Sequence, residues 1–232
     1  MDLDVIDLGL LEYETAWKLQ NDYATEIAEG KRPPTLLLLE HPHVYTFGRK
    51  GRAENLLWNE AQLIQKGITV HWADRGGDVT YHGPGQLVGY PLLPLGGVRT
   101  LRVLTSDLQS QETLQSIPQA DYVGYVRRLE QVLITALSRL GVESGQRSGL
   151  TGVWVRQSKI AAIGVKVDAR GVSRHGFSLN VNPEMGFWKG IVPCGLSEPV
   201  VSLADLIDPV PAMAKVKEEV VAAFCEIFEV SC

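Results

Sequence analysis

Two residues of the sequence, Cys194 and Lys159, have the chemistry of a covalent catalyst. Cys194 stands between a proline and a glycine, which favour a turn that can expose a thiol and point backbone N–H groups toward it. Lys159 precedes the apolar run 160–165. A thiol at its ordinary pKa of about 8.5 is only a few per cent ionised near pH 7, and a neighbouring ammonium group raises that fraction. The pair therefore predicts a thiolate nucleophile if the fold brings the two side chains together.

Each of these residues also has a plain structural interpretation. Most free cysteines are buried apolar side chains, and we interpret Cys225, in the middle of a predicted helix, in this way. Cys232 is the last residue, where chains fray. Lys166 and Lys189 are interpreted as ordinary lysines at a strand edge in water. Only the other motifs of the chain favour the catalytic interpretation of Cys194 and Lys159.

The stretch 75–86 is the most unusual part of the chain, because four of its twelve residues are glycine. Glycine lets a backbone take positive φ and approach a ligand closely. Between the glycines, 79–81 alternates as a short strand does, with a tight bend at each end. Arg75 and His82 flank this strand with one fixed cation and one ring that can change its charge. The stretch predicts either a ligand-binding wall or simply a glycine-rich hairpin.

The sequence predicts neither a metal nor a cofactor. His41 and His43 lie two apart in a predicted strand without a cysteine or carboxylate companion, which is a weak metal signal. No Gly-x-Gly-x-x-Gly motif leads from a strand into a helix, and the chain has no Gly-Lys-Ser/Thr phosphate loop. His71 is interpreted as a packing residue, and His175 is expected near the site.

The hydrophobic pattern predicts one domain over 1–232, of α+β (α/β) class, with a mixed β-sheet and packed helices. The segment 96–119 is polar without a clear period and predicts a surface loop or insertion. Helices are expected at 12–29, 59–66, 121–140 and from 211 onward. Strands are expected at 4–10, 35–39, 44–47, 68–72, 79–81, 86–93, 153–155, 160–167 and 176–181.

Composition narrows the class of protein. A hydrophobic content of 45% and a charged content of 21% over 232 residues are typical of a soluble globular protein. The net charge of −5 gives no basic face for nucleic acid. Three scattered cysteines, and no segment resembling a signal peptide or membrane span, predict a cytoplasmic protein without a disulfide framework. The absence of heptads makes a monomer the default expectation.

Taken together, five segments resemble the lipoyl(octanoyl) transferase family. They occur in the family's order and span most of the chain. The long glycine-rich motif, combined with a lysine strand and a Pro-Cys-Gly turn, makes the resemblance specific. The segments are His41-Pro-His-Val-Tyr-Thr-Phe-Gly-Arg49, Arg75-Gly-Gly-Asp-Val-Thr-Tyr-His-Gly-Pro-Gly-Gln86, Lys159-Ile-Ala-Ala-Ile-Gly-Val165, His175-Gly-Phe-Ser-Leu-Asn-Val181 and Pro193-Cys-Gly195.

The resemblance implies the fold of the biotin and lipoate protein ligase catalytic domain. It implies transfer of an octanoyl group from octanoyl-acyl carrier protein to a lysine of lipoyl domains, in 2-oxoacid dehydrogenase complexes and the glycine cleavage H protein. Cys194 would match the acyl-thioester cysteine, and Lys159 the lysine that lowers its pKa. The residues that would match substrate-binding segments are Arg75, Gly76, Gly77, Asp78, Val79, Thr80, Tyr81, His82, Ala162, Ile163, Gly164, Gly176, Phe177 and Ser178.

The chemistry of this reaction fits the residues. Exchange between thioesters is nearly isoenergetic, so a thiolate suffices and ATP is not needed. The run 160–165 is expected to line a slot for the eight-carbon chain. Backbone N–H groups at Gly76, Gly77 or Cys194 are candidates to stabilise the tetrahedral oxyanion.

Three alternatives remain open at this stage. An ATP-dependent lipoate ligase of the same fold would share the lysine strand but would not need Cys194. A carrier-binding protein without activity would need neither residue. A transferase whose donor is itself a lipoyl domain would use the same residues. The segment 96–119 is longer than the family usually has there.

Overall fold

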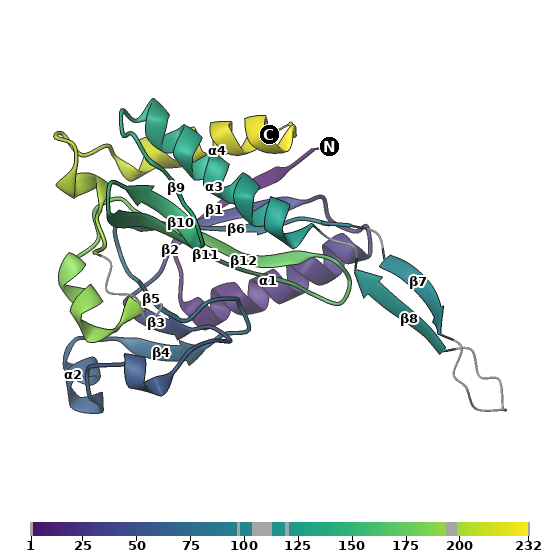
Figure 1. Cartoon of the computed structure of the whole chain (residues 1–232), viewed down its shortest axis with the longest axis horizontal. Helices are drawn as coiled ribbons and strands as arrows, with labels where there is room; N and C mark the ends of the chain where they lie inside the picture. Colours follow the sequence, from purple (N-terminus) through teal and green to yellow (C-terminus); the bar gives the residue numbers. More distant parts are fainter. Residues whose placement is uncertain (1, 97, 104–112, 119–120, 194–198, 232) are drawn as a thin grey trace.

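A seven-stranded mixed sheet forms the centre of the computed structural model, which describes residues 2–96, 98–103, 113–118, 121–193 and 199–231 (Figure 1). The strand order is β1-β2-β6-β12-β11-β10-β9. β1 and β2 are parallel, and every other neighbouring pair is antiparallel. The strands are β1 (Asp4–Leu10), β2 (Thr35–Glu40), β6 (Gln86–Leu92), β9 (Gly145–Arg147), β10 (Leu150–Val155), β11 (Ser158–Val167) and β12 (Ser173–Asn180).

The helices cover both faces of this sheet, and β2 shows why. Successive residues of a strand point to opposite faces. Leu36 and Leu38 pack into the core under α3 (Tyr122–Arg139) and α4 (Met213–Phe228). Leu37 and Leu39 pack on the other face against α1 (Tyr13–Ala28). A continuous apolar run in β2 therefore serves two cores, as expected for a strand in the interior of a sheet.

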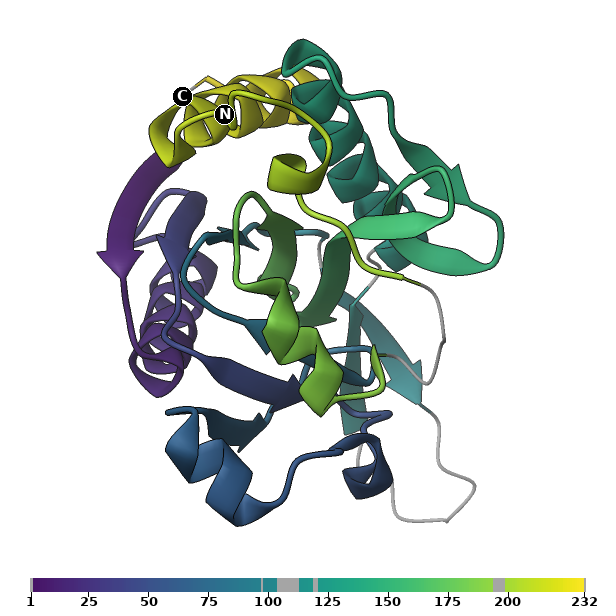
Figure 2. The same cartoon turned by 90° about the vertical axis from the view of Figure 1, so that its left-hand side faces the viewer.

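A second, three-stranded sheet lies on the α1 side of the large one (Figure 1). It contains β3 (Val44–Phe47), β4 (Thr69–Trp72) and β5 (Val79–His82), in the order β4-β3-β5. Tyr45, Phe47 and Tyr81 pack with Phe187 into a third core. Phe187 belongs to the short helix η2 (Met185–Gly190), which crosses one end of the molecule in light green in Figure 2. The remaining short helices are η1 (Ala53–Asn55), α2 (Glu60–Gln65) and η4 (Leu203–Asp205).

Two of the predicted helix starts, at Asn59 and Asp121, are confirmed by their caps. The Asn59 side chain accepts a hydrogen bond from the Gln62 N–H, and the Gln62 side chain accepts one from the Asn59 N–H, so α2 begins with a complete capping box. The Asp121 side chain accepts the Gly124 N–H at 2.8 Å and begins α3. These caps satisfy backbone donors that helix starts leave without intrahelical partners.

The segment 96–119 differs from its prediction as a surface loop. It contains two antiparallel strands, β7 (Val98–Val103) and β8 (Thr113–Pro118), which form a separate two-stranded sheet. The pair projects from the main body in Figure 1. The sequence of β7 does not alternate regularly between apolar and polar residues. The hydrophobic period that predicts the other strands is therefore missing from this one.

The structure also bears on the predictions about membrane spans and disulfides. In the part of the chain that the structure describes, no helix is long and apolar enough to cross a membrane. Cys225, in α4, is disulfide-bonded, and the prediction of a chain without disulfides is wrong at this residue. A sparse, odd set of cysteines did not reveal this pairing, because cysteine spacing in a sequence does not show which pairs meet in the fold.

Candidate active site

A cavity lies where β5 of the small sheet faces β11 and β12 of the large one. It encloses about 490 Å³ of empty space, part of which is open to solvent. We call it the central cavity. The residues that line it come from α1, the glycine-rich stretch and the two long strands, namely Tyr13, Arg75, Gly76, Gly77, Asp78, Val79, Thr80, His82, Tyr90, Ala162, Ile163, Gly164, His175, Gly176, Phe177 and Ser178.

The central cavity collects the three segments that the sequence predicts to bind substrate, with one exception. Every predicted residue except Tyr81 is among its lining residues. Tyr81 is fully buried in the third core, where its ring stacks on Phe187 with centroids 5.4 Å apart. Its hydroxyl is 2.9 Å from Nδ1 of His43. Tyr81 therefore supports the wall of the cavity and does not contact its interior.

Arg75 is a buried cation in the wall. Its Nη2 donates to Oγ1 of Thr46 at 2.9 Å, and its Nη1 donates to the Gly76 carbonyl at 2.9 Å. A Cβ on Gly48 would lie 2.7 Å from Arg75 Nη1 and 2.5 Å from the Gly77 carbonyl oxygen. Only glycine at 48 leaves room for the guanidinium group and the glycine-rich backbone together. The side chain is therefore held in one position beside the cavity.

His82 is a neutral ring in this wall. Its Nδ1 lies 2.7 Å from Oε1 of Gln86, whose amide nitrogen donates to the Tyr81 carbonyl and to Oδ1 of Asn180. Oε1 must therefore accept, and Nδ1 of His82 carries the hydrogen. Burial lowers the pKa of His82 to about 3, so the ring stays uncharged at neutral pH.

A charged cluster supports the same end of the cavity. Nε2 of His175 lies 2.7 Å from Oδ1 of Asp74, and Arg174 donates to the other carboxylate oxygen at 2.9 Å. Lys166 also contacts this carboxylate, so its interpretation as an ordinary exposed lysine is wrong. The hydrogen bond from His175, with Lys166 and Arg174, holds the pKa of Asp74 below its usual range. The carboxylate fixes the orientation of the His175 ring, which is almost fully buried.

A second, adjoining cavity holds Lys159. It shares Thr80, Ala162 and Ser178 with the central cavity, so the two spaces meet at these residues. Lys159 and Pro193 both line it, although they are far apart in sequence. Its remaining walls are Ala161, Asn180, Trp188 and Val200. The Lys159 amine therefore belongs to a largely apolar cavity that adjoins the central cavity.

The sheet fixes where the Lys159 side chain lies. Its Nζ is 4.8 Å from the centroid of the Trp154 ring, its partner across β10 and β11. A Cβ on Gly152 would come within 3.4 Å of Lys159 Cε and within 2.6 Å of the Ala161 carbonyl oxygen. Gly152 also has a φ of 120°, which other residues rarely adopt. The glycine leaves a path for the lysine side chain across the strand.

Cys194 itself lies outside the described residues, but the chain on both sides of it is described. Pro193, before it, lines the cavity of Lys159. After it, the Pro199 carbonyl accepts the Lys159 N–H at 2.9 Å, and the Val201 N–H donates to the Lys159 carbonyl at 3.0 Å. Both ends of the undescribed segment 194–198 are therefore next to Lys159.

The Gly76 N–H, one of the three candidate oxyanion donors, is not available for this role. The Gly76 N–H donates to the Val165 carbonyl at 3.0 Å and is already used. Val165 is six positions along β11 from Lys159, or about 20 Å at roughly 3.3 Å per residue. The Gly76 amide therefore belongs to the far end of the central cavity.

Sequence reasoning missed two residues of the central cavity, Tyr13 and Tyr90. Tyr13 is the first residue of α1, and Tyr90 lies in β6, where its hydroxyl is 2.7 Å from Nε2 of His41. Tyr13 sits in an amphipathic helix and Tyr90 in a fully buried strand, and only the tertiary fold turns them toward the cavity. His41 and His43 have separate partners, and no group of three potential metal-binding side chains occurs among the described residues.

Comparisons with known proteins agree with this geometry. A family model described as the lipoyl protein ligase A/B catalytic domain matches residues 12–225. An octanoyltransferase of Gloeobacter violaceus is 44% identical over 98% of this chain and 91% of its own length. An octanoyltransferase of Chloroflexus aggregans is 41% identical over 98% of this chain and 95% of its own length. A lipoate-protein ligase A solved with ATP has a TM-score of 0.72 at 17% identity, covering 100% of this chain and 87% of its own. At this low identity, the similarity to the lipoate-protein ligase A shows a shared fold only.

Proposed function

Because the chain belongs to the lipoyl protein ligase A/B catalytic domain family, we propose that it is an octanoyltransferase. It moves an octanoyl group from octanoyl-acyl carrier protein to the target lysine of a lipoyl domain. Relatives with the name octanoyltransferase support the activity, since they match nearly the whole chain at 41–44% identity. The octanoyl group passes through a thioester on Cys194.

One observation carries this proposal. Lys159 and Pro193 line the same cavity, and Cys194 is the next residue after Pro193. The backbone after the undescribed segment is hydrogen-bonded to Lys159 as well. This arrangement supports a Cys194 thiol within reach of the Lys159 amine, at the opening into the central cavity. An ammonium group there favours the thiolate over the thiol.

The first half-reaction forms the acyl-enzyme. The Cys194 thiolate attacks the thioester carbonyl of the donor, and a tetrahedral oxyanion forms. Its collapse breaks the bond to the donor sulfur, which leaves as a thiolate and takes a proton from the Lys159 ammonium or from water. A new thioester, between the octanoyl group and Cys194, replaces the old one, so the step needs no ATP.

The second half-reaction transfers the chain to nitrogen. The neutral amine of the acceptor lysine attacks the Cys194 thioester, and the tetrahedral intermediate expels the Cys194 thiolate. The nitrogen loses one proton. Lys159 can accept this proton, because its amine is neutral after it has protonated the donor thiolate in the first half-reaction. The product is an amide, which is more stable than a thioester, so this step drives the sequence forward. Because the two partners bind in turn, the kinetics are ping-pong.

The central cavity selects the chain. Ala162 gives it an apolar wall beside the cavity of Lys159, and the wall continues along the backbone of β11 and β12 toward Tyr13 and His175, while the Ile163 and Phe177 side chains pack in the core under α3. Burial of each methylene contributes about 0.8 kcal/mol, so the depth of the cavity distinguishes chain lengths. The buried side chains of His82 and Arg75 already form hydrogen bonds within the protein. They therefore do not require a charged ligand.

The partners of this reaction are the carrier protein as donor and a lipoyl domain as acceptor. The acceptor lysine belongs to the 2-oxoacid dehydrogenase complexes or to the glycine cleavage H protein. We further propose that the protein acts as a monomer and works in the cytoplasm.

Product formation tests this function. The purified protein is mixed with octanoyl-acyl carrier protein and a lipoyl domain, and the mass of the lipoyl domain is measured. We expect the domain to gain one octanoyl group without ATP. In a parallel reaction, free octanoate with ATP replaces the donor. Product in that second reaction alone would identify an ATP-dependent ligase and overturn the proposal.

A further inference from the structure

Trp154, whose ring contacts Lys159, lines a third cavity. We call it the outer cavity. It is formed by 141–147, by 154–156 and by Leu206 and Ile207, and it holds about 1060 Å³ of empty space, much of it open to solvent. None of these residues lines the central or the adjoining cavity. Trp154 connects the outer cavity to the catalytic lysine, since its ring also contacts Lys159.

The polar atoms of the outer cavity are unusual, because they are buried hydrogen-bond donors without partners. Nε1 of Trp154, Oγ of Ser144 and Nη1 of Arg147 are each buried and have no hydrogen-bond partner among the described residues. Trp154 is only 3% exposed. A buried donor without a partner is destabilising, and native proteins rarely tolerate one without a reason. Three such groups in one cavity are suited to a ligand that supplies acceptor oxygens.

The charge of the outer cavity points to an anion. The Arg147 guanidinium lies 4.7 Å from the Trp154 ring centroid, and Arg156 stands at the rim, exposed, on the turn between β10 and β11. Neither arginine forms an ion pair with a carboxylate of the described residues. Glu143 is the one carboxylate among the described lining residues, and it is exposed. This local positive charge stands out on a chain whose net charge is −5.

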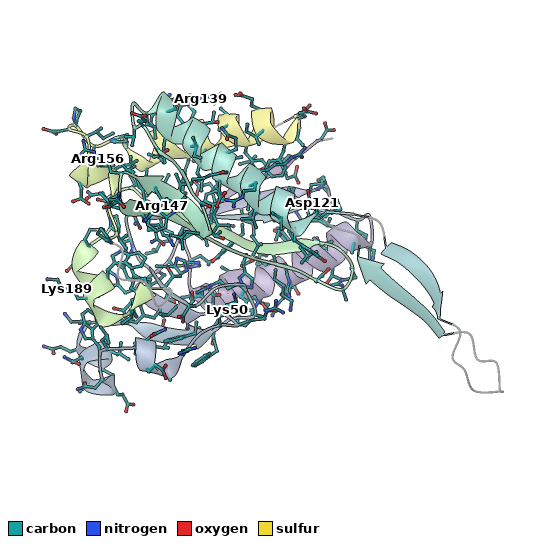
Figure 3. All side chains as sticks on the ribbon, viewed as in Figure 1. Lys50, Asp121, Arg139, Arg147, Arg156 and Lys189 are labelled. Atoms are coloured by element: carbon teal, nitrogen blue, oxygen red, sulfur yellow. The ribbon has the colours of Figure 1, made fainter. Side chains whose placement is uncertain are left out.

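Figure 3 shows where these cations lie. Arg156 and Lys189 lie at the end of the molecule at which η2 crosses the sheets, and Arg147 lies further in, over the strands. Lys189 belongs to η2, whose Trp188 lines the cavity of Lys159. Cations of the outer cavity and of η2 therefore lie near the catalytic lysine. A partner that presents a reacting group to Lys159 covers this end.

We propose that the outer cavity binds a carboxylate side chain of the lipoyl domain, close in space to its target lysine. The inference rests on the proposed function. Arg147 and Lys159 contact the same indole ring, so a group bound at Arg147 is only a short distance from the reaction. A lysine side chain is short and brings the surface of its own domain close to Lys159. The carrier protein, in contrast, delivers its thioester on a long arm, which keeps its surface farther away.

The expected contact is a charge-assisted one. A guanidinium group binds a carboxylate through two parallel N–H donors, and Ser144 and Trp154 supply further donors in the same cavity. Such hydrogen bonds to charged groups contribute more than neutral ones. The outer cavity would then orient the lipoyl domain so that its lysine enters beside Trp154.

The experiment separates the two half-reactions. Acyl-enzyme is prepared with octanoyl-acyl carrier protein, and its decay is then followed with a lipoyl domain or with hydroxylamine, a small nucleophile that needs no docking. For Arg147→Ala and Arg156→Ala, we expect the KM for the lipoyl domain to rise about tenfold, and Arg156→Glu to raise it further. Formation of the acyl-enzyme and its decay with hydroxylamine should stay within about twofold of the wild type. Lys18→Ala, which changes an exposed cation on α1, is the matched control.

Several outcomes would overturn the inference. An equal loss with hydroxylamine would mean that the arginines act on folding or on the catalytic lysine. A loss confined to acyl-enzyme formation would assign the cavity to the carrier protein. Unchanged kinetics in all three variants would leave it without a role in docking. If the wild type forms no acyl-enzyme at all, the proposed function fails, which is a different result from any of these.

A second measurement identifies the partner group. Carboxylates near the target lysine of the lipoyl domain are neutralised one at a time, as Asp→Asn or Glu→Gln. One of these changes should reproduce the loss seen with Arg156→Ala, and combining the two should cause no further loss. Additive losses for every pair would contradict a direct contact.

Discussion

The Nζ atom of Lys159 lies 4.8 Å from the centre of the Trp154 ring, and the two residues are direct partners across β10 and β11. The Trp154 ring contacts the amine, and the missing Cβ of Gly152 leaves room for the lysine chain. Lys159 also lines the cavity that Pro193 lines. The predictions below depend on this placement.

Replacing Lys159 by alanine should raise the pKa of the reactive thiol. Without the ammonium group, less thiolate is present at neutral pH, and a proton donor for the leaving group is lost. We expect acyl-enzyme formation to slow by about 10²–10⁴. The rate of Cys194 alkylation as a function of pH gives the thiol pKa directly. Lys18→Ala should leave the profile unchanged, and an unchanged profile for Lys159→Ala would remove Lys159 from this role.

Replacing Gly152 by alanine should destabilise the fold. The new Cβ would lie 2.6 Å from the Ala161 carbonyl oxygen, at a φ of 120°. Overpacking and backbone strain together should cost about 2–4 kcal/mol of unfolding free energy. Gly149→Ala is the control, because Gly149 also has positive φ but a Cβ added there would meet nothing within 4 Å. Urea unfolding compares the two variants, and equal costs would contradict the steric argument.

Ala162 should control the length of the acyl chain. It lies where the central and adjoining cavities meet, so a leucine there narrows the passage. We expect Ala162→Leu to lower kcat/KM for the octanoyl donor by about 10–100-fold, while a butanoyl donor loses much less. The comparison of donors of four to ten carbons checks this. The same loss for every chain length would show that the change acts on the chemistry or on folding.

The stability of the protein should fall on mild acidification. Burial lowers the pKa of His82 to about 3 and of His41 to about 4, whereas both would titrate near 6.5 in the unfolded chain. Below pH 6.5 the unfolded chain gains protons that the native rings do not take up. The stabilisation that is present above pH 6.5 is therefore lost as pH falls toward 4.

Each such ring should contribute a slope of about 1.4 kcal/mol per pH unit between these limits. Urea unfolding of the wild type and of His82→Gln at pH 7, 6 and 5 measures the slope. The variant should have the shallower dependence. Parallel curves would show that His82 is not the group that resists protonation. Asp74, whose pKa is lowered, adds a further loss only below its ordinary pKa of about 3.8.

The sequence predicted most of the sheet because its strands carry a clear pattern. The apolar run of β2 and the turn residues around β5 needed no tertiary information. β7 and β8 were missed, because their sequences do not alternate regularly between apolar and polar residues. β9 was also missed, since its three residues, Gly145–Arg147, have no hydrophobic pattern.

For the candidate site, the motifs predicted which segments meet and not how each side chain is used. Glycines around Arg75 indicated a close approach of backbone, and the structure brings that backbone against β11. The sequence could not show that Tyr81 turns into the third core, nor that Lys166 pairs with Asp74. Both depend on contacts between residues distant in the chain. The outer cavity had no motif at all, because its polar groups come from separated segments.

An octanoyl group is expected to reside on Cys194 between the two half-reactions. The intact mass of the protein after exposure to octanoyl-acyl carrier protein, without an acceptor, reveals it. We expect a gain of one octanoyl group, which disappears when a lipoyl domain is added and never forms in Cys194→Ser, whereas Cys225→Ser retains it. A transferable adduct that persists in Cys194→Ser would rule out the thioester on Cys194.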